Sequence, residues 1–133
     1  MAFTSPTDDI IVQEGTFAYS FTASGTIYAG QLVVPTGTMQ VIAAPGVSSA
    51  KCVGVAAYYV TDGEMVAVYG PGNIVRCCAS GTSVAVGECL IAGTEGKVLD
   101  VTDLYAKKSG ASIVGKALES QATADGAVRV LLV

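Results

Sequence analysis

The sequence predicts an all-β fold: a small β-barrel or sandwich of two pseudo-repeated halves, preceded by an N-terminal arm at residues 1–15. Three observations lead to this prediction. Turn signals such as Ser-Gly, Pro-Gly and Asp-Gly recur along the chain, the segments between them are short and rich in Val, Ile, Thr and Tyr, and several segments occur twice in the same order. Short strands separated by frequent turns are typical of barrels and sandwiches.

Alternation of side-chain type predicts the individual strands. Residues 16–21 carry an aromatic ring at every second position, which is the period of a strand with one buried face. The same strand character is found at residues 64–69, 73–78 and 127–133. The last segment is apolar to its final residue, so we expect it to form a buried strand. Only residues 102–108 and 117–124 could form a helical turn, and neither carries a sustained helical stripe.

An internal repeat predicts how these strands are organised. The matching pairs are residues 23–26 and 79–82, residues 52–56 and 113–117, and residues 63–68 and 125–130. The matches indicate one β domain at residues 16–133, with half-repeats at about 23–78 and 79–133. Because each half has one apolar face that it cannot bury alone, we expect the halves to close one core. Gly54 and Gly115 occupy matching strand positions and predict a bulge or a close backbone approach in both halves.

The composition predicts a chain that packs against partners. Hydrophobic residues make up 51% of the 133 residues and charged residues 14%, against roughly 25% charged residues in an average soluble domain. A domain of this size cannot bury half of its residues in one core, so we expect apolar side chains at subunit interfaces. No membrane partner is expected, because no apolar run reaches the roughly 18 residues of a membrane span. No nucleic-acid partner is expected, because the net charge is −4 and no basic cluster occurs.

The residue types that catalysis and metal binding need are absent or scattered. The chain has no histidine, which excludes Ser-His and Cys-His nucleophile pairs and every His-containing zinc site. Cys77 and Cys78 are adjacent on a predicted strand, so their side chains point to opposite faces and cannot easily bridge. We interpret these two residues, with Cys52 and Cys89, as small buried side chains. The sequence therefore predicts a non-enzyme with no catalytic residue, no cofactor and no metal.

Lys97 lies in a predicted hairpin, where biotinyl and lipoyl carrier domains place their modified lysine. The flanking methionines of a biotin site are missing, and the acidic neighbour is one position away from its place in a lipoyl site. Residues 93–98 also lack the spacing of a phosphate-binding loop and the Ser or Thr that follows its Lys. We interpret Lys97 as part of a plain solvated hairpin.

Glycines and apolar strand residues carry a family resemblance. The segments are GQLV at residues 30–33, VGVA at 53–56, GEMVAV at 63–68, GNIVR at 72–76, VGE at 86–88, VGKALE at 114–119 and DGAVRVLL at 125–132. Over roughly residues 16–133 the chain resembles the small capsid cement, or head decoration, proteins of tailed bacteriophages. The resemblance implies a structural virion protein that binds the outside of an expanded capsid, often as a trimer, and stabilises it. Its partners would be the major capsid protein and other copies of itself in a homotrimer, on the capsid exterior after synthesis in the host cytoplasm.

The N-terminal arm supplies the candidate contact residues. Phe3, Ile10 and Ile11 stand among polar residues of the arm, and Phe17 lies near the start of the first predicted strand. These four residues are the candidate contacts with the capsid or with a neighbouring subunit. Two alternatives remain open for the arm: a poorly ordered terminus or extra edge strand, or a segment that becomes ordered when it meets a neighbouring subunit.

A second function remains open, that of a fibre base or adhesion module that binds glycans on the host surface. Such a module needs exposed aromatic side chains, and the candidates are Tyr58, Tyr59, Tyr69 and Tyr105. In the cement interpretation the same tyrosines lie in the core or at interfaces.

Overall fold

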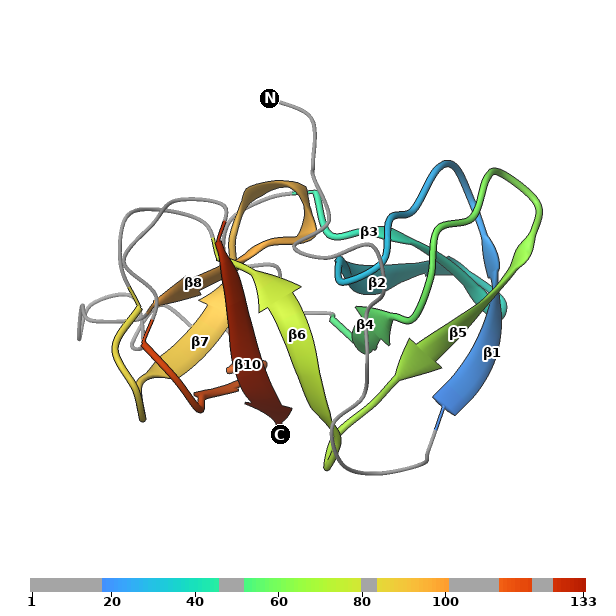
Figure 1. The fold of residues 1–133 in the computed structure, drawn as a ribbon. Helices are drawn as coiled ribbons and strands as arrows, with labels where there is room; N and C mark the ends of the chain where they lie inside the picture. The colour runs from blue at the N-terminus through green and yellow to red at the C-terminus, as the bar shows by residue number, and fades with distance from the viewer. Residues whose placement is uncertain (1–17, 46–51, 80–83, 101–112, 121–125) are drawn as a thin grey trace.

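In a computed structural model, the chain folds into two sets of five strands that lie next to each other (Figure 1). The structure describes residues 18–45, 52–79, 84–100, 113–120 and 126–133. The strands are β1 (Ala18–Ala23), β2 (Leu32–Gly37), β3 (Gln40–Ala43), β4 (Gly54–Ala56), β5 (Met65–Tyr69), β6 (Ile74–Cys78), β7 (Cys89–Ala92), β8 (Val98–Asp100), β9 (Gly115–Ala117) and β10 (Ala127–Leu132). One 3-10 turn, η1 (Thr94–Gly96), connects β7 to β8. The described part contains no α-helix, which confirms the all-β prediction; residues 102–108 lie outside it.

The first five strands form a closed barrel in the order β1-β3-β2-β4-β5, which we call the first barrel. It closes through five antiparallel residue pairs between β1 and β5, from Ala18–Tyr69 to Thr22–Met65. On its other side β1 runs parallel to β3, with Ala23 opposite Val41. Every strand of the first barrel therefore has two neighbours, and none is left with an unpaired edge.

The last five strands form the second sheet, in the order β6-β10-β9-β7-β8. Among the described residues, a parallel bridge joins Ala79, just after β6, to Val98 in β8. This bridge corresponds to the Ala23–Val41 pair of the first barrel, so the two strand sets share one topology. Both sets also carry the same local hydrogen bond: the Gly30 amide donates to the Ala56 carbonyl at 2.9 Å, and the Gly87 amide donates to the Ala117 carbonyl at 2.8 Å.

The boundary between the two strand sets lies between Tyr69 and Ile74. The repeated ASGT motif, which begins the predicted half-repeats, instead marks the ends of β1 and β6 in the structure. Each set therefore begins one strand earlier than the repeat predicts. The two first strands read AYSFTA and IVRCC, and their lack of sequence similarity hides the equivalence.

Two matched glycines make a close backbone approach, as the sequence predicts. A Cβ atom on Gly54 would overlap the carbonyl oxygen of Tyr69, and one on Gly115 would lie 2.6 Å from the carbonyl oxygen of Leu131. Backbone atoms cannot move aside as a flexible side chain can. Both strand sets therefore need glycine where their fourth strand meets their fifth.

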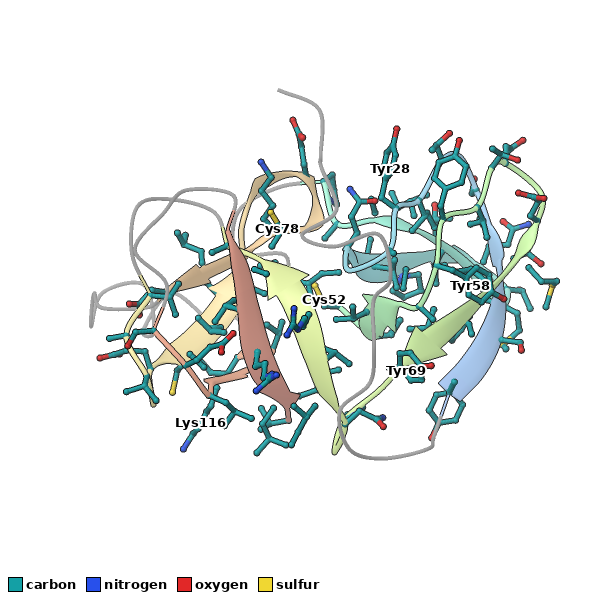
Figure 2. All side chains as sticks on the ribbon, in the orientation of Figure 1. Tyr28, Cys52, Tyr58, Tyr69, Cys78 and Lys116 are labelled. Carbon is teal, nitrogen blue, oxygen red and sulfur yellow. The ribbon has the colours of Figure 1, made fainter. Side chains whose placement is uncertain are left out.

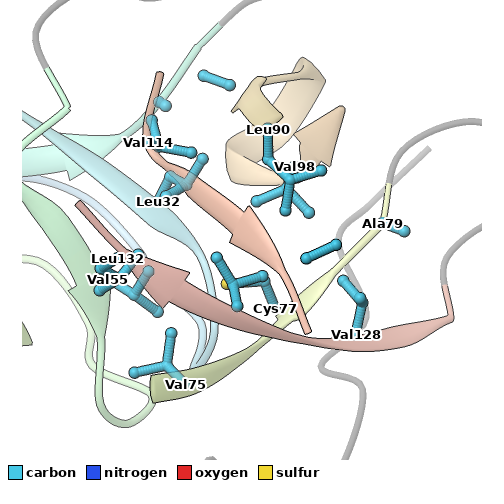
Figure 3. Close-up of a cluster of buried hydrophobic side chains, with 14 of the residues drawn as sticks. Leu32, Val55, Val75, Cys77, Ala79, Leu90, Val98, Val114, Val128 and Leu132 are labelled. Atoms are coloured by element: carbon cyan, nitrogen blue, oxygen red, sulfur yellow. The ribbon is translucent and has the colours of Figure 1, made fainter. Parts of the chain in front are cut away.

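Two clusters of buried side chains form the core. One fills the first barrel with inward-facing residues such as Val33, Val41 and Val66. The other fills the second sheet and extends to outward-facing residues of the first barrel, among them Leu32 and Val55 (Figure 3). The hydrophobic core thus continues across the boundary between the two strand sets. Strand β10 lies between β6 and β9 and has buried residues at every second position, which confirms the predicted buried final strand.

Candidate interaction surfaces

The joint between the two strand sets is built around Gln31, which is buried. Its side-chain oxygen accepts a hydrogen bond from the Tyr28 amide at 2.9 Å, and its side-chain nitrogen donates to the Glu95 carbonyl at 2.8 Å. The Gly96 amide also donates across the joint, to the Ala44 carbonyl at 2.9 Å. These bonds fix the β7–β8 connection against the first barrel.

The prediction of a solvated hairpin around Lys97 was wrong. Lys97 is only 6% exposed, although the hairpin position and charge favoured an exposed side chain. The physical reason is the joint just described, because the adjacent residues Glu95 and Gly96 are bonded to the first barrel. Burial also removes the exposure that a modification enzyme would need.

A basic face occupies the outer side of the second sheet. Arg76 in β6 and Arg129 in β10 lie directly opposite each other in the antiparallel register. They are the only arginines of the chain. Lys116 in β9 is exposed and pairs with Leu131 on the other side of β10 (Figure 2). We call Arg76, Arg129 and Lys116 the basic face.

An aromatic cluster lies on the first barrel. Tyr58 and Tyr59 are 48% and 55% exposed, so the structure does not place them in the core. The ring of Tyr59 lies 5.2 Å from that of Tyr28, between centroids, at an angle of 50°. Tyr69 is half-buried and packs against the core that spans the two strand sets, while Tyr105 lies outside the described residues (Figure 2).

A pocket of about 200 Å³ opens between the two strand sets. The first barrel contributes Leu32, Cys52 and Pro71 to its walls, and the second sheet contributes Val114 and Leu132. The side chains around the pocket are apolar apart from the Cys52 thiol, and backbone groups supply polar surface. The pocket presents no charged side chain to a ligand.

The cysteines behave largely as the sequence predicts. Cys77 and Cys78 are buried, Cys52 and Cys89 are half-buried, and no disulfide joins any two of the four. Burial raises the pKa of Cys77 to about 12 and that of Cys52 to about 11. Because the thiolate is the nucleophilic form, neither residue is an activated nucleophile.

The four candidate contact residues of the N-terminal region, Phe3, Ile10, Ile11 and Phe17, lie outside the described residues. Within residues that are described, no three His, Cys, Asp or Glu side chains gather where they could hold a metal ion. Among the described residues, no helix is long and apolar enough to cross a bilayer.

Neither the burial of Gln31 nor the pairing of the two arginines could be predicted from the sequence. Gln31 appears there only as one letter of a repeated segment, and its role depends on a carbonyl group contributed by the other strand set. The two arginines are brought together by the register of β6 against β10. The repeated segments do not by themselves indicate that register. The available signal was the rarity of arginine, because the chain has only two.

Comparison with known proteins adds a family and a fold. A family model described as phage cement protein matches residues 12–132. The chain is also similar to a solved structure, described as the head fibre gp8.5 N base of bacteriophage phi29, at 18% sequence identity and a TM-score of 0.65. That similarity covers 88% of this chain and 93% of the other, and at this level of identity it supports the fold alone. No curated protein matches the chain.

Proposed function

The chain belongs to the phage cement protein family, and we propose that it decorates the exterior of a phage capsid and stabilises it, acting as a trimer. Membership makes the chain a structural component of a phage virion. The observation that carries the proposal is the extent of the family match, which runs from residue 12 to residue 132 and so includes both strand sets.

The architecture supports this role. A decoration protein has to resist deformation while it holds neighbouring subunits together, and a closed barrel leaves no strand edge free to move or aggregate. We also propose that the two strand sets act as one domain, at residues 16–133. The continuous core and the Gln31 and Gly96 hydrogen bonds support this.

Binding to undecorated capsids tests the proposal. Purified protein mixed with expanded capsids of its own virus should bind in a fixed ratio to the capsid subunits and raise the temperature at which the particles disrupt. Particles that bind no protein, or that bind it without any gain in heat or low-salt resistance, would refute the cement function.

The capsid-binding experiment also tests the candidate contact residues of the N-terminal region. We propose that Phe3, Ile10, Ile11 and Phe17 contact the capsid or a neighbouring subunit. A chain that begins at residue 16 lacks Phe3, Ile10 and Ile11 but keeps Phe17, so its comparison with full-length protein separates the arm from the folded body. Equal capsid affinity of both forms would remove the arm from the proposal.

A second candidate function is supported by the exposed tyrosines. Tyr58, Tyr59 and the neighbouring Tyr28 form an aromatic surface of the kind that stacks against sugar rings. Binding to a glycan array that is lost in Tyr58→Ala/Tyr59→Ala would establish an adhesion role. An array without signal would leave these tyrosines as a protein contact surface.

A further inference from the structure

The basic face carries charge that the described part of the chain does not balance. Arg76 and Arg129 are half-buried, and the Nε atom of each is buried with no hydrogen-bond partner. Neither guanidinium forms an ion pair with any described carboxylate. The nearby Glu119 carboxylate accepts a hydrogen bond from the backbone amide of Arg129 at 3.1 Å. With Lys116, the basic face holds three of the seven cationic residues of a chain whose net charge is −4.

The fold itself does not require these charges. In the first barrel, the register position equivalent to Arg76–Arg129 is the pair Ser20–Ala67, in strands with the same order and direction. The first barrel closes there with two small neutral side chains. Like charges opposite each other on neighbouring strands destabilise a sheet. The arginine pair therefore lowers the stability of the second sheet, although the shared topology does not require charges at this position. A partner that supplies negative charge would offset that loss of stability.

The chemistry of the basic face indicates a protein carboxylate as that partner. Paired guanidinium groups bind carboxylates through two parallel hydrogen bonds each, which gives direction as well as affinity. Ile74 and Leu131 lie opposite each other two residues along the strands, on the same face as the arginines. Both are half-buried, so apolar side chains border the charges. A charged centre beside apolar residues is the composition of a protein interface.

Matching carboxylates occur at the turn between β4 and β5 of the first barrel. Asp62 and Glu64 are both exposed there. One oxygen of Asp62 accepts a hydrogen bond from the Gly25 amide at 2.8 Å, and one oxygen of Glu64 accepts from the Thr61 amide at 2.7 Å. These bonds hold the two carboxylates in place, and those from Thr61 keep the pKa of Glu64 below its usual range. We call Asp62 and Glu64 the acidic turn.

The acidic turn and the basic face of one chain lie apart. In Figure 1 the turn before β5 is at the right-hand end of the first barrel, whereas β6 and β10 are on the other side of β4 and β5. Resting on the proposed function, we propose that the basic face of one copy binds the acidic turn of the next copy. Such a contact joins two different surfaces, so repeated around a rotation axis it closes a ring, and three copies would make the proposed trimer.

Two variants test the interface without endangering the fold. Arg76→Ser/Arg129→Ala places the residues of the first barrel at equivalent positions, and Asp62→Asn/Glu64→Gln keeps the oxygens that accept the turn hydrogen bonds. Sedimentation velocity should show concentration-dependent association of the unmodified chain, and each variant should weaken it by at least about tenfold. Salt at about 1 M should have the same effect on the unmodified chain, because it screens exposed charges.

Mixing the two variants gives the decisive result. The arginine variant retains its acidic turn and the carboxylate variant retains its basic face, so a mixture should form a one-to-one pair that neither variant forms alone. Ser20→Ala/Ala67→Ser, which exchanges the neutral residues of the first barrel, is the matched control and should associate as the unmodified chain does. A chain that is monomeric at every concentration, unchanged association of the arginine variant, or no pairing in the mixture would each overturn the proposal.

Capsid binding separates this proposal from the proposed function. Variants that no longer associate but still bind capsids would leave both proposals standing, with the trimer interface distinct from the capsid contact. An arginine variant that still associates but no longer binds capsids would assign the basic face to the capsid and overturn the interface between copies. Failure of all forms to bind capsids, with the mixture pairing as expected, would remove the cement function alone.

Discussion

The first barrel and the second sheet share a topology but differ in what covers their outer faces. In the first barrel, Leu32 and Val55 face outward and are buried by the second sheet. The equivalent positions of the second sheet, Cys89 and Lys116, are half-buried and exposed. The interior residues and the strand-crossing glycines are kept in both sets. The fold is therefore set by the inner faces and the close backbone contacts, while the outer faces are free to contact different neighbours.

Removing the final strand should have the largest effect, because β10 pairs with both β6 and β9. Deletion of residues 129–133 exposes the core of the second sheet and should abolish soluble folding. Deletion of Val133 alone, which is 55% exposed, is the control and should leave the melting temperature nearly unchanged. Soluble, cooperatively folded protein from the longer deletion would contradict the role of β10 in the shared core.

Substitution of the matched glycines tests whether the two strand sets are equivalent. Gly54→Ala and Gly115→Ala should each lower the free energy of unfolding by about 3 kcal/mol or more, because the new methyl group meets a backbone carbonyl. Gly63→Ala is the control: its φ of +85° is unfavourable for alanine but nothing lies within 4 Å, so about 1 kcal/mol is expected. Urea denaturation measures all three. A tolerated Gly115→Ala beside a damaging Gly54→Ala would break the equivalence.

The joint residue Gln31 should matter more than its counterpart in the second sheet. Gln31→Ala removes the side-chain hydrogen bonds to the Glu95 carbonyl and from the Tyr28 amide and should cost about 1–3 kcal/mol. Glu88 occupies the matching position but is only half-buried, so Glu88→Ala should change stability by less than about 0.5 kcal/mol. Thermal unfolding of the two variants side by side gives the result. Equal losses would mean that the joint does not depend on the Gln31 side chain.

Neutralising the arginine pair should have the smallest effect on the isolated chain, and with the opposite sign. Arg76→Ser/Arg129→Ala should raise the free energy of unfolding by about 0.2–1 kcal/mol, because it removes two opposed like charges. The measurement belongs at low salt and at a concentration where the chain is monomeric. A clear loss of stability would show that the arginine stems contribute packing within the chain, as long charged side chains can.

Much of the fold could be predicted because local patterns determined it. Alternating residues identified β1, β5, β6 and β10, and the repeated glycines identified the close approach at Gly54 and Gly115. The start of the repeat could not be located, because the first strands of the two sets share almost no residues. A strand can change nearly every side chain while its backbone hydrogen bonds persist.

The interaction surfaces were less predictable because they depend on contacts between distant residues. Lys97 was expected in solvent, and only the docking of its neighbours Glu95 and Gly96 on the first barrel explains its burial. The basic face needs the pairing of β6 with β10, which places Arg76 opposite Arg129 although the two lie far apart in the sequence. The arm residues were proposed from their apolar character alone, and they remain a prediction.

The seam that closes each strand set has a further consequence for local opening. In the part of the chain that the structure describes, two residue pairs join β1 to β3, and the Ala79–Val98 bridge joins the second sheet at the same place. Hydrogen exchange reports partial opening of such a seam before global unfolding. Comparing the amides beside Val98 with those beside Val41 would show which seam opens at the lower free energy. A capsid that holds the second sheet closed would slow amide exchange in the second sheet more than in the first barrel. The protection of the amides would therefore show which strand set the capsid contacts.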